Sequence, residues 1–333
     1  MLHLIPIPTP FPVGPVNVYL AEGDPLTLID TGPKDGAALA ALEAGLAQQG
    51  RRVEDLRRIV LTHHHADHIG LTAQLAARSG AEVLTHPYNL PWLADYAAER
   101  ERHQPFFRKI WDEAGVPGEI VKVMDQAGEG FTDWIDPFPD ARPIHEGDTL
   151  TLQTPDSGPQ TWKVFHTPGH AGGLICLWDE ASRTLVSNDH LIGHISSNPV
   201  LEPPPLMNGP RPKRLVEYLH QMQRMAALEP RVALPGHGEV IEDVPGLVRR
   251  RLTFHKHRAE KILDALGARP LTLWELTQPI FPRLTRPMDF FLALSEILGH
   301  LDLLEEDGKA KPVREGKLVK WQAQHDLTPY PLS

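Results

Sequence analysis

The chain has 333 residues, of which 41% are hydrophobic and 23% charged, and its formal net charge is −10. The length predicts about two domains, and the composition is ordinary for a globular protein. The negative net charge argues against a protein whose whole surface attracts polyanions. A single cysteine excludes a disulfide framework within the chain and fits a reducing compartment.

The N-terminal segment predicts neither a targeting signal nor a membrane anchor. Residues 1–8 are apolar, but prolines interrupt them and no basic residue precedes them, unlike in a secretory signal peptide. No apolar run in the chain is long enough to predict a membrane span. We therefore expect a cytoplasmic protein with no membrane partner.

Strands and helices are expected to alternate through the first part of the chain. Apolar runs bounded by turn residues predict strands, and Ala and Leu at helical spacing before Gly50 predict a helix. The expected strands are 2–7, 16–21, 26–29, 58–61 and 82–85, and the expected helices are 37–49 and 71–78.

The run Thr62–His68 reads Thr-His-His-His-Ala-Asp-His and directly follows the apolar strand at 58–61. Side chains two residues apart in a tight loop after a strand can converge on one point. Imidazole and carboxylate are ligands that suit zinc, iron and manganese. The pattern assigns His63 and His65 to one metal and Asp67 and His68 to a second, with His64 pointing away.

Other apolar strands also end in a polar group beside glycine or proline. Asp30 ends the strand at 26–29, and such strand ends suggest one sheet edge lined by a site. Later strands end in His170, Asp189 and His237 in the same way. The resulting prediction is His63, His65 and His170 for the first metal, Asp67, His68 and His237 for the second, and Asp189 as the bridge.

The ordered set His-x-His-x-Asp-His, Thr-Pro-Gly-His, Asn-Asp and Pro-Gly-His-Gly resembles the metallo-β-lactamase-fold hydrolases over about residues 1–250. The resemblance implies an α/β fold, an αββα sandwich with two divalent metal ions at one edge. Zinc is the expected metal, with iron and manganese as alternatives. The resemblance also implies a hydroxide that bridges the metals, with Asp67 and Asp189 as catalytic residues. Where this family usually has Gly-Asp, the chain has Asn188-Asp189, which keeps the carboxylate.

Several polar residues near these motifs have simpler roles as alternatives. Asp30 is expected to orient a ligand histidine by accepting its second N–H. The loop after Asp189 carries further residues that either contact substrate or serve as turn and cap residues. These residues are His194, Ser196 and Asn198. Packing is the favoured role for His64, His166, His190 and His194 taken singly.

Residues 86–143 form an unusual aromatic segment with helical patches at 90–102 and 105–114, separated by glycine and proline. The resemblance places such an insertion above the metal edge. We therefore expect a helical lid that gives the substrate pocket an apolar wall. The alternative is that most of these aromatic side chains pack a small core of the insertion itself.

The tail differs in character from the rest of the chain. Helices are expected at 259–266 and 289–304, with a third beginning at Thr272, whose capping box is completed by Glu275. A β-ribbon with its turn at Gly316 follows. This pattern resembles a winged-helix domain over residues 251–333, after a catalytic domain at 1–250. Basic residues gather in the ribbon, at Lys309, Lys311, Arg314, Lys317 and Lys320.

Two functions lead the sequence interpretation. The first is a dinuclear hydrolase of a small ester, thioester or lactone, favoured by the aromatic insertion and the acidic net charge. The second is a metal-dependent endoribonuclease acting on single-stranded RNA, favoured by the tail. The helix expected at 289–304 lacks Lys and Arg, so dimerisation through the tail is preferred to duplex binding. A mononuclear iron persulfide dioxygenase is a third alternative.

Overall fold

The computed structural model describes residues 2–154, 158–267 and 269–324. These residues form two compact units, which are described separately. Unit 1 runs to Arg102 and adds Glu129–Ser197 and Glu217–Arg249. Unit 2 comprises His103–Gly128, Asn198–Val216 and the described residues from Arg250 onward. Residues 325–333, the end of the expected C-terminal domain, lie outside the described residues.

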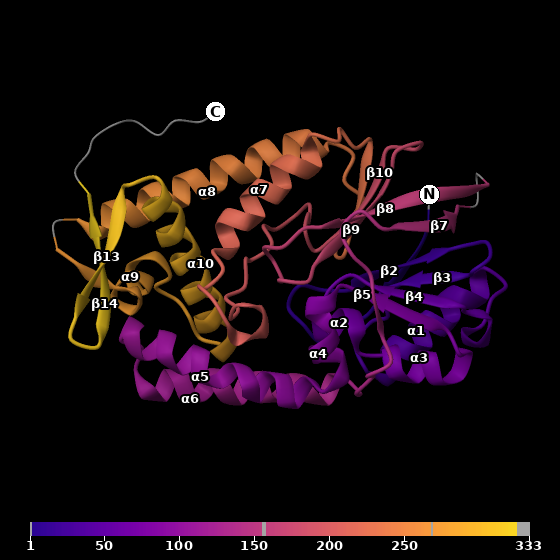
Figure 1. The fold of residues 1–333 in the computed structure, drawn as a ribbon, viewed down its shortest axis with the longest axis horizontal. Coiled ribbons are helices and arrows are strands. Elements are labelled where there is room, and N and C mark those ends of the chain that lie inside the picture. Colours follow the sequence, from indigo (N-terminus) through magenta and orange to yellow (C-terminus); the bar gives the residue numbers. More distant parts are fainter. Residues whose placement is uncertain (1, 155–157, 268, 325–333) are drawn as a thin grey trace. The chain divides into compact units, whose positions relative to one another are not determined.

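Two sheets form the frame of unit 1 (Figure 1). The first is antiparallel from β1 to β3 and parallel from β3 to β6, and in the second only the β10–β11 pair is parallel. In spatial order the first sheet has β1 (His3–Ile7), β2 (Val16–Ala21), β3 (Thr27–Ile29), β4 (Arg58–Leu61), β5 (Glu82–Thr85) and β6 (Arg142–Pro143). The second has β11 (Val232–Pro235), β10 (Thr184–Asn188), β9 (Ile175–Asp179), β8 (Pro159–His166) and β7 (Thr149–Gln153).

The first sheet is buried on both faces, because successive side chains of a strand point to opposite sides. In β4, Val60 belongs to a core shared with the second sheet, whereas Ile59 and Leu61 belong to a core shared with helices. The shared core of the two sheets includes Trp162 of β8 and Leu234 of β11. Unit 1 is therefore a sandwich of two sheets.

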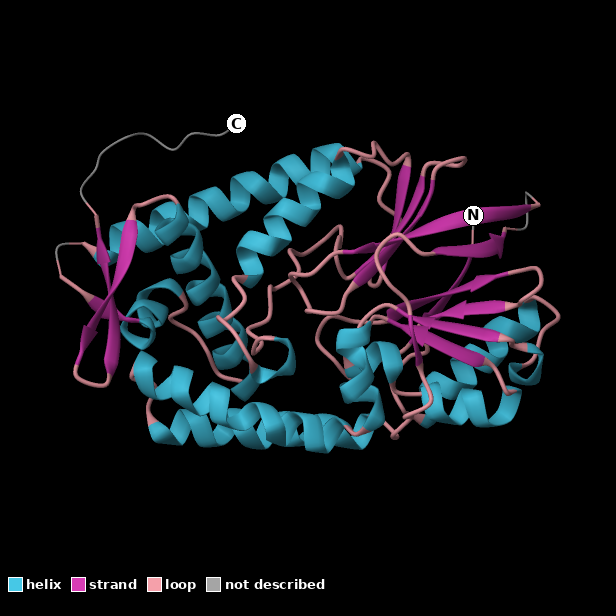
Figure 2. Cartoon of the chain, in the orientation of Figure 1, coloured by secondary structure: helices cyan, strands magenta, loops and turns pink. Residues whose placement is uncertain are grey.

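Helices cover the outer faces of this sandwich. On the first sheet, α1 (Gly36–Gln48) contributes Leu42 and α3 (Thr72–Ser79) contributes Leu75 to the outer core. On the second sheet, α7 (Arg214–Ala226) places Arg224 4.8 Å from the ring centre of Phe165 on β8. The fold is the expected α/β class with an αββα sandwich (Figure 2). The five polar strand ends come from both sheets, so the expectation of one sheet edge was wrong.

The aromatic insertion divides between the two units. Pro105 lies inside α5 (Tyr96–Ala114), so the break expected before it was wrong, and the helix is interrupted at Asp95 instead. Proline removes one backbone donor, but the following aromatic residues Phe106, Phe107 and Trp111 pack in the core of unit 2. In unit 1, Tyr96, Phe131, Trp134 and Phe138 pack against the outer core. The remaining elements here are α4 (Leu90–Ala94), α6 (Gly118–Glu129), η2 (Pro87–Asn89) and η3 (Gly130–Trp134).

Unit 2 is built mainly from the tail. The helix expected at 259–266 is the end of α8 (Val244–Leu266), and the expected domain boundary at residue 250 falls inside this helix. The capping box of Thr272 and Glu275 is confirmed. The other helices of unit 2 are α9 (Leu273–Ile280), α10 (Pro287–Glu306) and η4 (Pro205–Met207). Its sheet has the spatial order β12 (Leu271–Thr272), β14 (Leu318–Ala323) and β13 (Ala310–Glu315). Two further elements, η1 (Val53–Asp55) and α2 (Ala66–Ile69), belong to unit 1.

None of the helices in the described ranges combines the length and the apolar character that a membrane crossing requires.

Candidate metal centre

The histidine run lies where β4 ends and α2 begins. His63 follows the strand, and His65 is the residue that precedes the first turn of α2. Asp67 and His68 lie on that turn, so the structure replaces the expected tight loop with a short helix. The end of β4 and the first turn of α2 therefore direct these four side chains towards the same region.

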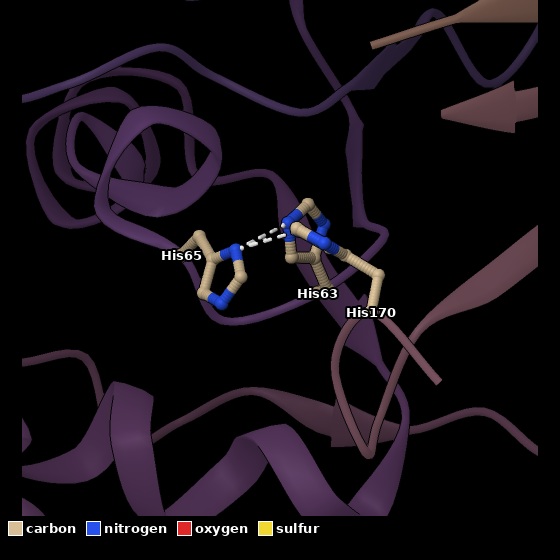
Figure 3. A group of neighbouring side chains, drawn as sticks. All are labelled: His63, His65 and His170. Atoms are coloured by element: carbon tan, nitrogen blue, oxygen red, sulfur yellow. Dashed lines mark hydrogen bonds between the residues drawn. The ribbon is translucent and has the colours of Figure 1, made fainter. Parts of the chain in front are cut away.

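Three imidazoles, two from the run and one from a later loop, form a first group (Figure 3). His65 Nδ1 lies 3.0 Å from His63 Nε2 and 3.0 Å from His170 Nε2. His63 and His65 follow β4 in the first sheet, whereas His170 comes from the loop after β8 in the second. The group therefore joins the two sheets of the sandwich.

A second group combines Asp67, His68 and His237, and Asp189 lies between the two groups. His237 Nε2 is 3.3 Å from Asp67 Oδ2. Asp189 Oδ1 lies 3.6 Å from His68 Nε2, and its Oδ2 lies 3.5 Å from His170 Nε2 and 3.6 Å from His237 Nε2. One carboxylate thus reaches ligand atoms of both groups.

The arrangement fits divalent cations. Two nitrogens bound to one tetrahedral zinc lie about 3.3 Å apart, since Zn–N distances are about 2.0–2.1 Å. The 3.0 Å separations in the first group are close to that value. Within the described residues, three buried atoms of the second group and of Asp189 make no hydrogen bond, although each faces the cluster. These atoms are His68 Nε2, His237 Nε2 and Asp189 Oδ1.

The two groups differ in electrostatics. Burial, followed by repulsion from neighbouring imidazoles, holds the pKa of His63 and of His65 well below the usual value. Burial also acts against the charged form of His68, but the carboxylates of Asp189, Asp67 and Asp30 raise its pKa well above the usual value. In the metal-free protein these shifts favour the neutral form of His63 and His65 and the charged form of His68.

Asp30 fixes the orientation of two candidate ligands. Its Oδ2 accepts hydrogen bonds from His68 Nδ1 and from Thr62 Oγ1, each at 2.8 Å. Since that hydroxyl donates to Asp30, it accepts from His63 Nδ1 at 3.1 Å, which turns His63 Nε2 towards the cluster. Asp30 was expected to orient one histidine. Thr62 was not selected as a site residue from the sequence, although it is the first residue of the run.

Residues of β2 hold the loop that carries His237. Tyr19 Oη donates to Pro235 O at 2.6 Å, and Asn17 Nδ2 donates to Gly238 O at 2.8 Å. His237 Nδ1 lies 2.8 Å from Pro15 O, so its Nε2 faces the cluster. None of these residues was singled out from the sequence. A buried asparagine in an otherwise apolar strand was the one available signal, and nothing local links it to a loop more than 200 residues away.

Other residues singled out from the sequence are not members of these groups. His64 stacks on Trp92, with ring centres 4.5 Å apart, and so turns away from the cluster. His194 is exposed and lies beside Gly238, where an added Cβ would be 2.8 Å from the His194 ring. Asn198 belongs to unit 2, where its amide donates to Leu292 O. Substrate contact by His194, Ser196 or Asn198 stays a prediction.

His166 and His190 were expected to be packing residues. His166 stacks on His86, with ring centres 3.9 Å apart, and its Nε2 lies 2.8 Å from Gly172 O. His190 is fully buried and contacts the edge of Tyr218. Neither histidine belongs to a candidate ligand group among the described residues.

The family model described as the metallo-beta-lactamase superfamily matches residues 11–237. A protein of Bacillus subtilis (strain 168), named a probable metallo-hydrolase, is 36% identical over 319 residues, which are 95% of each chain. The crystal structure of a metallo-beta-lactamase family protein from Thermus thermophilus has a TM-score of 0.79 and 30% identity, covering 97% of this chain and 98% of that one. The crystal structure of a beta-lactamase domain protein from Burkholderia ambifaria has a TM-score of 0.79 and 22% identity, covering 96% of this chain and 92% of that one. It agrees with this chain in fold. The chain belongs to the metallo-beta-lactamase superfamily.

Proposed function

We propose that the protein is a metal-dependent hydrolase with two divalent metal ions, acting on a small ester, thioester or lactone. Zinc is the proposed metal, because imidazole and carboxylate ligands in sets of three or four suit it. His63, His65 and His170 would hold the first ion, and Asp67, His68 and His237 would hold the second. The Asp189 carboxylate lies between these two groups.

The position of Asp189 carries this proposal. Its two carboxylate oxygens lie between the two groups of ligands, within 3.6 Å of nitrogens on His68, His170 and His237. A buried carboxylate is stable where cationic groups or metals compensate its charge. Each group combines residues from both sheets. A bridging role for Asp189 explains why the two groups meet at this residue.

The protein residues prepare the site for hydrolysis. Divalent cations bound there would lower the pKa of a bound water towards about 7 and would polarise the substrate oxygen. The side chain of Asp67 is 13% exposed, and this carboxylate is placed to accept the proton that the attacking water loses. The fully buried Asp30 holds His68 directly and His63 through the hydroxyl of Thr62, so that the Nε2 atoms of both histidines face the cluster.

Aromatic side chains beside the first group favour an apolar acyl substrate. His64 lies 5.1 Å from the His65 ring, and it stacks on Trp92, which in turn contacts Tyr96 at 4.8 Å between ring centres. This row of rings begins next to a candidate ligand and is only partly buried at Trp92 and Tyr96. An acyl chain bound there gains free energy from apolar contact.

The ribbon of unit 2 gives less support to RNA cleavage. Arg314 pairs with Glu113 at 2.7 Å, and Lys320 pairs with Glu315 at 2.6 Å. These carboxylates offset part of the positive charge that phosphate contact needs. Lys311 and Lys317 are exposed on the same ribbon, so single-stranded RNA stays the second candidate. Dimerisation through this region stays a prediction as well.

A substrate panel with matched variants tests the proposal. Zinc-loaded wild-type protein is assayed with a p-nitrophenyl ester, an acyl-thioester, a lactone and a labelled single-stranded RNA. Asp67→Ala controls for contaminating enzymes, and Asp136→Asn, which alters an exposed ion pair with Lys34, controls for loss of a carboxylate elsewhere.

The proposal expects wild-type protein and Asp136→Asn to hydrolyse an acyl substrate at least about 10²-fold faster than Asp67→Ala, the scale of a lost general base. RNA cleavage by the wild type and not by Asp67→Ala would replace the acyl hydrolase with the nuclease. Oxygen consumption with a persulfide and one iron per chain would favour the dioxygenase.

A further inference from the structure

Asn188 lies between Asp30, which orients two candidate ligands, and Asp189, whose carboxylate lies between the two groups of candidate ligands. Its side chain is fully buried, and Nδ2 donates to Asp30 Oδ2 at 2.6 Å. Its Oδ1 accepts a hydrogen bond from the backbone N–H of Asp189 at 2.8 Å. One amide group thus connects Asp30 to the peptide that carries Asp189.

We propose that Asn188 is a positioning residue, which fixes the Asp189 carboxylate at the point where the two groups of metal ligands meet. This inference rests on the proposed metal centre and assigns one of its supports to a side chain that is not a ligand. Its two hydrogen bonds leave the amide of Asn188 one orientation, because the donor side faces Asp30 and the acceptor side faces Asp189.

The backbone around Asn188 is arranged for the same purpose. Asn188 has φ +44°, a left-handed conformation that asparagine tolerates better than most side chains. The pairing of β10 with β11 shifts register between Val186 and Asn188. Such an irregularity bends a strand and redirects the next side chain, which here is Asp189.

Gly236 closes the other side of the Asp189 carboxylate. A Cβ added at Gly236 would lie 2.0 Å from Asp189 Oδ1 and 2.9 Å from Asn188 Oδ1. The backbone of the loop that follows β11 therefore touches both side chains. Asp189 is held between this backbone and the amide of Asn188, which limits the carboxylate to a narrow range of positions.

Two substitutions separate the role of the side chain from that of the backbone. Asn188→Gly keeps the left-handed conformation, which glycine adopts readily, and removes both hydrogen bonds. Asn188→Asp keeps the shape and the acceptor for Asp189 N–H, but it places a second carboxylate oxygen against Asp30. Glu229→Gly is the matched control, because Glu229 is exposed and also has a positive φ, of +49°.

The test measures metal binding without turnover. Zinc and cobalt are titrated into each metal-free protein against a chromophoric chelator, and the cobalt absorption bands report the ligand geometry. The thermal midpoint of each metal-free protein shows whether the fold is intact.

The inference predicts that wild type and Glu229→Gly bind two equivalents. Asn188→Gly should bind the weaker equivalent about 10–100-fold less tightly, as for loss of an outer support of a metal site, with altered cobalt bands and little change in the metal-free midpoint. Asn188→Asp should weaken it further, because of repulsion from Asp30.

Equal affinities and identical cobalt bands in wild type and both Asn188 variants would overturn the role of Asn188 and leave the proposed metal centre standing. Failure of the wild type itself to bind either metal would overturn the metal centre, and this inference with it. If Asn188→Gly alone loses its fold, the comparison of Asn188→Asp with wild type decides between the same results.

Discussion

His68 Nδ1 donates to Asp30 Oδ2 across 2.8 Å, and both side chains are completely buried. The bond keeps the Nδ1 proton on the side of Asp30, so that loss of the second proton frees the lone pair of Nε2. That nitrogen faces Asp67 and Asp189, at 3.8 and 3.6 Å. Asp30 therefore controls which atom of His68 can bind a metal.

Replacement of Asp30 is expected to weaken the metal site. Asp30→Asn presents an amide nitrogen to donors on Thr62, His68 and Asn188, and it keeps nearly the same volume. We expect metal affinity to fall about 10–100-fold, measured by competition with a chelator. Asp136→Asn, an exposed change in the same unit, is expected to bind as the wild type does. Equal affinities in both variants would contradict the orienting role.

Metal affinity is expected to rise with pH. The pKa of His68 and of His237 is raised in the metal-free protein; burial opposes this, but carboxylates led by Asp189 outweigh it. A metal must displace the proton from each nitrogen, so binding releases protons and affinity increases as the pH rises. Calorimetric titration in two buffers of different protonation enthalpy measures the release. An affinity that does not change between pH 6 and 8 would count against this arrangement.

Gly236→Ala is expected to disturb the centre more than its size suggests. The new Cβ would lie 2.0 Å from Asp189 Oδ1, so the carboxylate or the strand end must move. Overpacking of this kind costs about 1–3 kcal/mol. Metal stoichiometry and the thermal midpoint should both fall. Gly36→Ala, whose Cβ meets nothing within 4 Å, is the control and should change neither; normal metal content in Gly236→Ala would show that Asp189 can move freely.

The residues that the structure gathers into these groups could be singled out from the sequence, because each candidate ligand lies shortly after a strand and carries its own chemistry. The pattern at 63–68 and the three later motifs could be recognised locally, without knowledge of which strands are neighbours. Apart from Asp30, the residues that support the candidate ligands could not be predicted in this way. Asn17, Tyr19 and Asn188 act through hydrogen bonds to residues distant in the chain, and in a strand their sequence context is that of ordinary core residues.

The difference between local patterns and contacts distant in the chain also explains where the expected elements were wrong. A proline inside a helix normally kinks or breaks it. Helix α5 nevertheless continues through Pro105, because the residues after it pack in the core of unit 2. The first part of α8 was missed, since its charged residues obscure helical periodicity. Local patterns identified β-strands and caps, whereas these features depend on contacts formed in the folded chain.

Unit 2 is expected to lose stability in mild acid. His255 Nδ1 lies 3.2 Å from His300 Nε2, and burial lowers the pKa of these residues to about 3 and about 4. Both folded values lie below the unfolded value of 6.5. The unfolded chain therefore binds more protons as the pH falls, and stability that is complete above about pH 6.5 is lost towards pH 4.

At pH 5 the expected loss is about 2 kcal/mol for each histidine, since each unit between the two pKa values corresponds to about 1.4 kcal/mol. Hydrogen exchange of α10 at pH 7.5 and pH 5, corrected for the intrinsic rate, measures the opening free energy. His300→Leu should reduce the difference between the two pH values. An unchanged difference in the variant would assign the acid sensitivity to other groups.

Metal content is the most direct test of the account. Elemental analysis of the purified wild-type protein and of His237→Ala, after equilibration with zinc and removal of unbound metal, gives the number of ions per chain. The account predicts two ions in the wild type and fewer in the variant, with the loss falling on the group of Asp67 and His68. A wild type without metal, or a variant that binds as many ions as the wild type, would contradict it.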